Sequence, residues 1–506
     1  MLSFEGLTAA EPGVRAVLDG IRQGQVASVC LFKSSNVLSP AQLRELSEAM
    51  YQAARDGGQL PPLIGIDQEG GQLIAIANGA TELPGNMALG ATRSPELAEA
   101  AGRVLGRELL AMGINLDFAP ALDVNTNPAN PVVGIRSFGE DPAQVAALGS
   151  ALITGMQAEG VIATAKHFPG HGDTASDSHF DAPVVSHDLE RLRAVDLVPF
   201  QGAIRSGVGA VMTAHVIAKV VDPENPATLS APVLESLLRD ELGFDGLTIT
   251  DAMDMEAVAQ FGPVPSVERA LAAGADLVLL GWLQDQFALR AAVAGQERPE
   301  AVARIERAQR RAPTELPPMS VVGCQEHQSI AQQIADRSIT VVRDTAGRLP
   351  LRPQADDMVA VITVYPQNLT PADSSASVRV EIADAIRRRH PLVLSLELAY
   401  GAPLSHIGPI LEAVAHVDHI VVGTIQAEND PVQADLVKTL NARGKQPVVV
   451  AMRTPYDLVA FPMVDSYLCA YGIRGATTEA LARVLLGEIK ATGTLPCRIP
   501  GLVELA

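Results

Sequence analysis

Residues 166–179 (KHFPGHGDTASDSH) gather the titratable side chains that a proton-transfer site or a metal site requires. Four of the ten histidines fall between positions 167 and 187, and Asp173 and Asp177 lie among them. The run begins where an apolar, strand-like segment (161–165) ends, and its glycines and proline shape a loop. Titratable side chains on a loop that a scaffold holds in place are typical of catalytic sites. The run therefore predicts either acid–base chemistry or metal binding.

The histidine spacing does not fit a helical zinc motif. His167 and His171 are four residues apart, but Pro169 and Gly170 lie between them, so they cannot share a helix face as the ligands of H-E-x-x-H do. A metal-dependent barrel hydrolase stays an alternative. Structural roles compete as well, because His167 and His171 can be satisfied within a core or loop and His187 can belong to a turn that enters a helix.

The triplet Asp177-Ser178-His179 suits proton transfer. A carboxylate two residues before an imidazole can accept its N–H, fix its tautomer and stabilise the imidazolium. An unperturbed histidine has a pKa of about 6.5, so it can give and take a proton near neutrality. We therefore expect His179 and Asp177 to form an acid/base dyad.

Asp251 ends another apolar run, residues 246–250 (GLTIT). A carboxylate that leaves a buried strand can serve as a nucleophile, a metal ligand or a helix N-cap. Asp254 is the better-placed N-cap if a helix begins one turn later. Together with an imidazole acid/base, Asp251 would complete the pair of groups that covalent catalysis needs.

The elements that must hold these residues follow a regular alternation over the first 300 or so residues. Eight short apolar runs recur, at 2–4, 26–32, 63–67, 115–121, 161–167, 210–216, 246–252 and 276–281. Between them lie amphipathic stretches, such as 39–56, 94–112, 142–159, 192–206 and 231–242, with glycines where a helix would end in a left-handed residue, at Gly57, Gly113, Gly160, Gly207, Gly243 and Gly274. Runs that are apolar throughout predict strands buried on both faces. Eight such units predict a (β/α)8 TIM barrel, with a doubly wound sheet as the alternative.

The polar residues favour the barrel, because they fall at or just beyond the carboxyl ends of the runs. In a barrel those ends meet on one face, where active sites are built. The residues concerned are Asp67, Asp117, Asp123, Lys166, His167, His215 and Asp251.

A second unit follows the barrel. Residues 311–318 (RAPTELPP) have the composition of a linker, and further strands are expected near 358–364, 392–398, 419–425, 447–452 and 466–471 after a helix at 328–338. We predict a barrel at 1–312, a linker at 313–324 and a smaller α/β sandwich domain with an open parallel sheet at 325–506. The second domain has no G-x-G-x-x-G or Walker-type loop, so no nucleotide cofactor is expected there.

Composition excludes several partners. The 506 residues include 38 basic and 58 acidic side chains, and the resulting charge of −20 argues against nucleic acid and against anionic membranes. No apolar run reaches the roughly 18–20 residues that span a bilayer. We expect a monomer or weak homo-oligomer.

The cysteines and the N-terminal segment bear on the compartment. Cys30, Cys324, Cys469 and Cys497 show no C-x-x-C spacing, which predicts free thiols. The first residues have neither a basic segment nor an apolar core typical of a signal peptide. A cytoplasmic protein is expected, unless an export signal lies upstream of residue 1.

Five motifs in order resemble glycoside hydrolase family 3, and within it the β-N-acetylglucosaminidase branch of two-domain type. They are residues 66–71 (IDQEGG), 118–125 (FAPALDVN), 136–142 (RSFGEDP), the KHFPGHGDT…DSH loop and residues 249–255 (ITDAMDM). The closing segments 349–351 (LPL) and 493–496 (GTLP) are similar to the second domain of such members.

The resemblance implies a role for each matching position. Asp251 matches the nucleophile, and His179 with Asp177 matches the acid/base dyad of this branch. Residues that would bind the terminal sugar are Asp67, Arg136, Lys166 and His167, to which we add Met212 and His215 at the sixth run. No metal and no organic cofactor is implied.

The resemblance also implies the reaction, the hydrolysis of terminal β-linked N-acetylglucosamine with retention, on peptidoglycan or muropeptide fragments. Related β-glucosidases usually take the acid/base from a glutamate of the second domain, so a dyad on a barrel loop is what indicates N-acetylglucosaminides. The usual inference from the separation of two carboxyl groups does not apply, because one partner is an imidazole. Alternatives are a β-N-acetylglucosaminide phosphorylase, a β-glucosidase or β-xylosidase, and a non-enzymatic sugar-binding protein on the same fold.

One motif departs from the family pattern. The family commonly continues D-Q-E-G-G with R-V-Q-R, whereas this chain has Gln72 and Ala75 at the two arginine positions. Fewer cationic donors are then expected at the terminal sugar.

Overall fold

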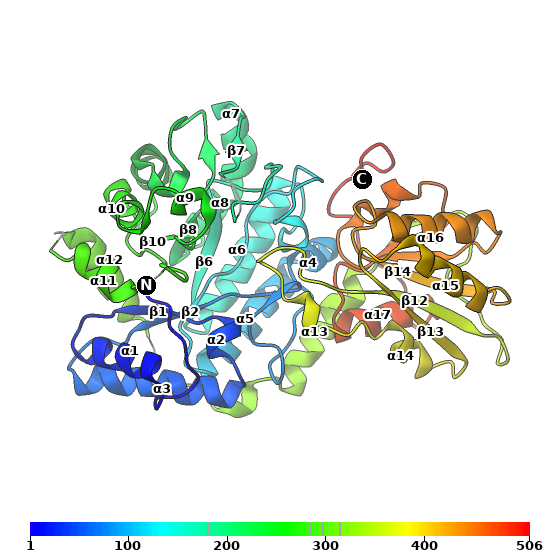
Figure 1. The fold of residues 1–506 in the computed structure, drawn as a ribbon, viewed down its shortest axis with the longest axis horizontal. Helices are drawn as coiled ribbons and strands as arrows, with labels where there is room; N and C mark the ends of the chain where they lie inside the picture. The colour runs from blue at the N-terminus through cyan, green and yellow to red at the C-terminus, as the bar shows by residue number, and fades with distance from the viewer. Residues whose placement is uncertain (180–181, 284, 296–297, 313–314, 506) are drawn as a thin grey trace.

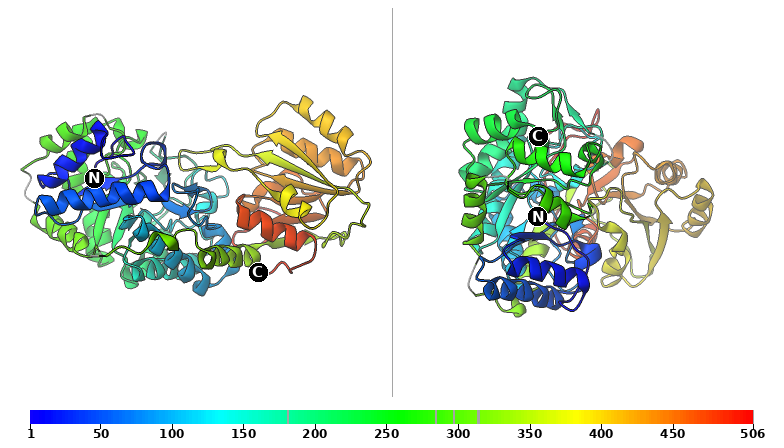
Figure 2. Two further views of the ribbon diagram at one scale, coloured as in Figure 1. Left: turned by 90° about the horizontal axis from the view of Figure 1, so that it is seen from below. Right: turned by 60° about the vertical axis from the view of Figure 1, so that its left-hand side comes forward.

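Two α/β units lie side by side in the structure, a computed structural model that describes residues 1–179, 182–283, 285–295, 298–312 and 315–505 (Figure 1). The first unit is blue to green in the figure and the second is yellow to red. Two further views show the same separation of the units (Figure 2). The predicted barrel followed by a smaller α/β domain is confirmed.

A curled sheet of six parallel strands forms the centre of the first unit. Every residue of these strands is buried, as the uniformly apolar runs predicted, because helices cover the outside of the sheet. In sheet order the strands are β1 (Ser28–Cys30), β2 (Leu63–Ile66), β5 (Leu116–Asp117), β6 (Ile162–Phe168), β8 (Ala210–Thr213) and β10 (Leu247–Thr250).

The expected first and eighth strands are reduced to single bridges. Leu2 pairs with Val29 and Leu277 pairs with Ile249, each in parallel. At the eighth position a side chain adds to the main-chain bonds, since the Asp276 carboxylate accepts from the Thr248 N–H at 2.9 Å, beside the bond from the Thr250 N–H to the Leu277 carbonyl at 3.0 Å. Main-chain bonds from Met1 N to the Val278 carbonyl (2.8 Å) and from the Leu280 N–H to the Met1 carbonyl (3.2 Å) join the two segments. The ring therefore closes, but with two strands shorter than predicted.

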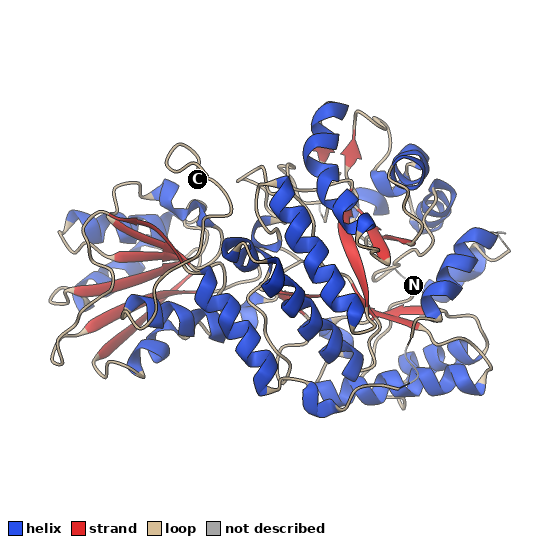
Figure 3. Ribbon diagram, turned by 180° about the vertical axis from the view of Figure 1, so that it is seen from behind, coloured by secondary structure: helices blue, strands red, loops and turns tan. Residues whose placement is uncertain are grey.

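Eight helices follow the eight strand positions. They lie around the sheet (Figure 3). They are α1 (Pro12–Arg22), α3 (Pro40–Asp56), α5 (Pro95–Ala111), α6 (Pro142–Ala158), α8 (Leu197–Arg205), η4 (Pro232–Glu241), α10 (Pro263–Ala273) and α12 (Pro299–Gln309). All but α8 begin with proline, whose missing N–H costs nothing in the first turn. Ser39, Ser94 and Asp141 accept hydrogen bonds from first-turn N–H groups of α3, α5 and α6.

Local details differ from the sequence prediction. The stretch 232–241 and the turn η2 (Leu192–Asp196) are π-helical rather than α-helical. Gly57 has a φ of −88°, and the left-handed residue after α3 is Gly58, with a φ of +65°. The other five predicted glycines do have positive φ. The prediction was one residue early at α3 because the helix continues to Asp56 and Gly57 remains in its last turn.

Shorter elements lie on the loops of the barrel. Those near the strand ends are α2 (Lys33–Asn36), the hairpin of β3 (Gln68–Gly70) and β4 (Leu73–Ile74), α4 (Asn86–Thr92), η1 (Gly134–Arg136), and the pair β7 (Val184–Val185) and β9 (Ile217–Ala218). Others are α7 (Leu189–Arg191), η3 (Ala227–Leu229), α9 (Glu256–Ala259) and α11 (Gln286–Ala292).

The second unit is a six-stranded sheet between helices. Its order is β11 (Thr340–Asp344), β16 (Ser466–Cys469), β15 (Val448–Ala451), β14 (His419–Thr424), β12 (Val359–Tyr365) and β13 (Val393–Ala399). The five predicted strands are parallel, and β11 adds an antiparallel edge that the sequence did not reveal. The chain order reverses at β12, which lies between β13 and β14. Loops at the carboxyl ends of such a switch point are the usual ligand site of open sheets.

The helices of the second unit are α14 (Ile382–Arg387), α15 (Ile407–Ala413), α16 (Pro431–Ala442) and α17 (Gly475–Leu485), with turns η6 (Ser375–Ser377), η7 (Leu404–His406) and η8 (Pro455–Ala460). The two units are joined through η5 (Met319–Val321) and α13 (Gln325–Ser338), and α13 packs against α4, α5 and α17. Glu108 of α5 accepts hydrogen bonds from the Gly323 N–H and from His327. The segment predicted as a linker therefore ends against the barrel, and part of it (313–314) lies outside the described residues.

Within the described residues, no helix combines the length and the apolar character needed to cross a bilayer. All four cysteines are free thiols, and Cys324 is the one that is partly exposed.

Candidate active site

A cavity of about 790 Å³ opens at the carboxyl ends of the barrel strands. It lies where the positions of the polar residues predicted a site, and its volume is in the range of small-ligand pockets. Seven of the nine predicted site residues line it, namely Asp67, Arg136, Lys166, His167, His179, Met212 and Asp251. The other two, Asp177 and His215, lie behind the cavity wall.

Asp251 leaves the end of β10 and reaches the cavity. Its Oδ1 accepts the Ala252 N–H at 2.8 Å. Burial alone would raise the pKa of Asp251, but the neighbouring imidazoles of His167, His215 and His179 and the Ala252 N–H hold that pKa below its usual value. The carboxylate is therefore ionised and can act as a nucleophile. Neither it nor Asp254 is an N-cap, because α9 begins at Glu256 and Asp254 accepts the Trp282 N–H at 3.0 Å.

The expected dyad is formed within one loop. His179 Nδ1 lies 2.6 Å from Asp177 Oδ1, which also accepts the His179 main-chain N–H at 3.0 Å. Burial favours the neutral acid, but hydrogen bonds from the His179 ring and main chain lower the pKa of Asp177. An ionised Asp177 accepts the Nδ1 hydrogen, so Nε2 is the ring nitrogen suited to exchange a proton with a substrate. The His179 side chain is 25% exposed, whereas Asp177 is buried beneath it.

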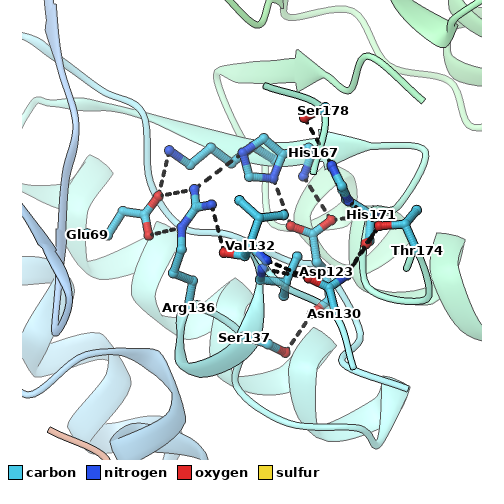
Figure 4. A network of polar contacts seen from close by, with 12 residues as sticks. Glu69, Asp123, Asn130, Val132, Arg136, Ser137, His167, His171, Thr174 and Ser178 are labelled. Atoms are coloured by element: carbon cyan, nitrogen blue, oxygen red, sulfur yellow. Dashed lines mark hydrogen bonds and ion pairs between the residues drawn. The ribbon is translucent and has the colours of Figure 1, made fainter. Parts of the chain in front are cut away.

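Two buried cations, Lys166 and Arg136, share the carboxylate of Glu69 at the cavity floor. Lys166 Nζ lies 2.7 Å from both Asp67 Oδ1 and Glu69 Oε1. Arg136 forms a two-pronged contact with Glu69 at 2.7 and 2.9 Å (Figure 4). Burial alone would raise the pKa of Glu69, but the two cations lower it to about 2. Glu69 therefore fixes both cations, and Asp67, whose side chain is 34% exposed, is the carboxylate that a ligand can reach.

Asp123 holds the adjacent histidines in place. His167 Nδ1 lies 2.8 Å from Asp123 Oδ2, and the His171 N–H donates to Asp123 Oδ1 at 2.7 Å (Figure 4). Although Asp123 is fully buried, contacts with His167 and His171 hold its pKa well below the usual range. Arg136 Nη2 lies 3.4 Å from His167 Nε2. Because arginine only donates, His167 carries its hydrogen on Nδ1 and presents a lone pair at Nε2 to Arg136.

His171 and His215 position the loops that carry the reacting groups. His171 bonds to Thr174 and to Ser178, next to His179, and burial lowers its pKa to about 4. His215 is fully buried between Thr228 Oγ1 (2.7 Å) and the Ala252 carbonyl (3.0 Å), so the structure does not place it at the cavity surface. Burial also lowers the pKa of His215. The sequence predicted that His215 binds the sugar. In the structure both of its ring nitrogens have protein partners, and it does not line the cavity.

The second domain completes the cavity wall. The loop after β12, yellow in Figure 1, contributes Asn368, Pro371, Ala372, Asp373, Ser374, Ala376 and Ser377. Ser374 donates from its N–H (2.9 Å) and its hydroxyl (2.8 Å) to the Gln72 carbonyl of the β3–β4 hairpin. Arg453 binds both Asp373, at 2.8 Å, and the Gln72 side chain. These contacts join segments that lie 302 and 381 residues apart in the chain, and no sequence pattern predicted them.

The two departures from the family motif therefore lie in different places. Gln72 contacts the second domain through Arg453 and the Ala372 carbonyl, and it does not line the cavity, whereas the buried Ala75 does. The expectation that both positions serve the terminal sugar is wrong for Gln72. An arginine there would face the cations Arg453 and Arg474, both of which lie at this junction.

Among the residues that the structure describes, no three histidine, cysteine or carboxylate side chains gather as a set of metal ligands. The His167–His171 pair is instead occupied by Asp123, Thr174 and Ser178.

An ionised carboxylate and an imidazole–carboxylate dyad that share a cavity with ion-paired polar side chains define a hydrolase site of the glycosidase type. Residues 14–314 match the model of the glycosyl hydrolase family 3 N-terminal domain, and the chain belongs to glycoside hydrolase family 3.

Relatives and a solved structure extend this similarity over the whole chain. Beta-hexosaminidase A of Pseudoalteromonas piscicida is 32% identical over 95% of this chain and 90% of its own length. A beta-hexosaminidase of Stenotrophomonas maltophilia is 41% identical over 52% of this chain and 78% of its own. The structure of a glycoside hydrolase family 3 beta-N-acetylglucosaminidase from Paenibacillus sp. str. FPU-7 matches with a TM-score of 0.89 at 36% identity, covering 100% of this chain and 98% of that one.

Proposed function

We propose that this glycoside hydrolase is a retaining exo-β-N-acetylglucosaminidase. The observation that carries the proposal is the His179–Asp177 dyad on a barrel loop, in the same cavity as the ionised Asp251. Relatives that carry the name beta-hexosaminidase and the similar beta-N-acetylglucosaminidase structure support the same substrate class. The motifs support terminal β-linked N-acetylglucosamine of peptidoglycan fragments as the natural substrate.

The reaction uses three side chains in two steps. Asp251 attacks the anomeric carbon while protonated His179 gives its Nε2 proton to the glycosidic oxygen, so the aglycone leaves and a glycosyl–Asp251 ester forms. His179, now neutral, takes a proton from water as the water attacks the ester. Free sugar is released, and the Asp251 carboxylate and the protonated His179 are regenerated. Asp177 stabilises the imidazolium in each cycle. Two displacements at one carbon retain its configuration.

The cavity floor binds the terminal sugar in this proposal. Asp67 accepts from sugar hydroxyls, and Lys166, Arg136 and His167 are held for donation or contact by Glu69 and Asp123. Because these groups are paired before the substrate arrives, little reorganisation is needed on binding.

Hydrolysis of a panel of nitrophenyl β-glycosides tests the proposal. We expect the N-acetylglucosaminide to have a kcat/KM at least about tenfold above the glucoside and xyloside, with retained configuration in the first-formed product. Activity should survive chelator treatment. A preference for the glucoside or xyloside, or loss of activity with chelator, would replace the proposal with one of the other hydrolases.

Phosphorolysis is a second candidate because the acid/base is an imidazole. A carboxylate base would be anionic during the second step and would repel phosphate, whereas a neutral imidazole would not. We expect sugar 1-phosphate to form beside free sugar when phosphate is raised, as product analysis with and without phosphate would reveal. If only free sugar forms at high phosphate, the enzyme is a hydrolase alone.

The substitution Ala75→Arg tests whether the cavity lacks a cationic donor. Ala75 lines the cavity where the family carries arginine, and a hydrogen bond from a charged donor is worth about 1.5–3 kcal/mol. We expect KM for the N-acetylglucosaminide to fall about tenfold with kcat little changed, because the contact stabilises bound substrate and transition state alike. Ala75→Met is the control for added bulk. An unchanged KM, or a gain for another sugar only, would mean that Ala75 does not mark a vacant donor position.

A further inference from the structure

The cavity has an outer part that the reaction described above does not use. Its inner part consists of polar groups, among them the buried Lys166 and Arg136 and the partly exposed Asp251. The outer part carries Trp282, the one tryptophan of the chain, and Phe32. The two rings lie 4.9 Å apart between centroids and are inclined by 45°. Trp282 is 36% exposed, so a large apolar side chain faces solvent beside the reacting groups.

Both rings are held in position by the barrel. Phe32 follows the carboxyl end of β1, and its N–H donates to Asn36 Oδ1 at 3.0 Å. Trp282 follows the eighth strand position. Its main-chain N–H donates at 3.0 Å to the carboxylate of Asp254, three residues beyond Asp251. The aromatic pair is therefore fixed relative to the nucleophile and is not a chance surface feature.

Polar groups from the two domains continue the wall beside the rings. Lys33 Nζ, next to Phe32 in the chain, donates to Ser377 Oγ of the second domain at 3.3 Å. Asn368 Oδ1 accepts the Ala376 N–H at 2.7 Å, which leaves its amide NH2 group for a ligand. All five of these residues line the cavity. An aromatic face flanked by donors and hydroxyls matches a pyranose, whose C–H faces are apolar and whose rim is polar.

We propose that Trp282 and Phe32 form the binding surface for the second sugar of the substrate, with Lys33, Asn368 and Ser377 supplying its polar contacts. The inference rests on the proposed function, because it takes the inner part as the place of the terminal N-acetylglucosamine. The bond to be broken then lies between the buried floor and the exposed rings, and the ligand class is a β-linked oligosaccharide. The outer sugar leaves with the first step, so this surface affects formation of the glycosyl–Asp251 ester and not its hydrolysis.

Kinetics of two substrates, one whose leaving group is a second sugar and one whose leaving group is fluoride, test this assignment when each is compared between variant and unaltered enzyme. For Trp282→Ala we expect kcat/KM on N,N′-diacetylchitobiose to fall about tenfold or more, while kcat/KM on N-acetyl-β-glucosaminyl fluoride, which has no second sugar, stays within about twofold. Phe287→Ala, which removes an aromatic side chain of similar exposure (39%) outside the cavity, is the control and should change neither. Equal losses on both substrates, or no loss on the disaccharide, would overturn the assignment.

A second measurement does not depend on the Trp282 variant being folded. Since Trp282 is the only tryptophan, intrinsic fluorescence reports directly on this position. In Asp251→Asn protein we expect diacetylchitobiose to shift or quench the emission and N-acetylglucosamine to leave it nearly unchanged. Equal responses to the two sugars, or none to the disaccharide, would contradict the inference.

Failure of the proposed function is separable from failure of this inference. Turnover of the glucosaminyl fluoride by the unaltered enzyme tests the function alone. If glucosyl fluoride is cleaved instead, the same comparison is made with cellobiose and glucosyl fluoride, and the ratio between the two substrates again decides the role of Trp282.

Discussion

Asp251→Ala should lose essentially all turnover and keep its fold. Covalent catalysis has no substitute for the attacking group, so we expect kcat to fall by about 10⁴-fold or more, in line with removal of other enzyme nucleophiles. The fold should survive because, within the described residues, the hydrogen bond to this carboxylate comes from the adjacent Ala252 N–H and joins it to no distant segment. Removing a buried charge also relieves its desolvation. The readouts are kcat on the nitrophenyl glycoside and the thermal unfolding midpoint.

Labelling identifies the nucleophile independently of the loss of activity. A 2-deoxy-2-fluoro or related mechanism-based sugar should form a stable ester on the peptide that contains Asp251, as mass spectrometry of the digested enzyme would show. Asp245→Ala, which alters an exposed barrel carboxylate outside the cavity, is the control and should keep both activity and labelling. A label on another residue, or an active Asp251→Ala protein, would remove Asp251 from the mechanism.

Local patterns were sufficient to predict the alternation of strands and helices and the face on which the site lies. Strands such as β6 and β8 are buried along their whole length, and most of their residues other than Lys166 and His167 are apolar. Seven barrel helices begin with proline. Proline favours a helix start through the first turn alone, so this signal can be read from the local sequence. Asp177 and His179 lie in one loop, so their spacing predicted a contact that the structure shows at 2.6 Å.

Features that depend on contacts between distant segments were not predictable. Glu69 stands in a recognised motif, but its role as the shared partner of Arg136 and Lys166 emerges only when three loops meet at the cavity floor. The wall formed by residues 368–377 depends on how the second domain packs against the hairpin near Gln72. The eighth strand is reduced to the bridge between Ile249 and Leu277, and the Asp276 side chain bonds to the Thr248 N–H beside it. Each of these outcomes is decided by packing geometry and not by a periodic pattern.

His179→Ala should discriminate between substrates by their leaving groups. A poor leaving group, such as a sugar or methanol, needs a proton at the glycosidic oxygen, and general acid catalysis contributes roughly 10²–10⁴-fold. A dinitrophenolate needs none. We therefore expect kcat/KM to fall by about 10³-fold on diacetylchitobiose and to stay within about tenfold on the dinitrophenyl glycoside. Because the second step still needs a base, kcat on the dinitrophenyl glycoside should fall, with a burst of dinitrophenolate before the steady state.

The role of Asp177 follows from its contacts with His179. The ionised Asp177 accepts both the ring and the main-chain N–H of His179, so Asp177→Asn should show the same pattern more mildly, by losing the charge that stabilises the imidazolium.

Azide should restore turnover of the dinitrophenyl glycoside by His179→Ala and give a β-glycosyl azide, because an anionic acceptor needs no base to attack the ester. The same leaving-group series on the two variants separates catalysis from binding. If all substrates lose activity equally and azide has no effect, His179 contributes to sugar binding and the proton comes from another group.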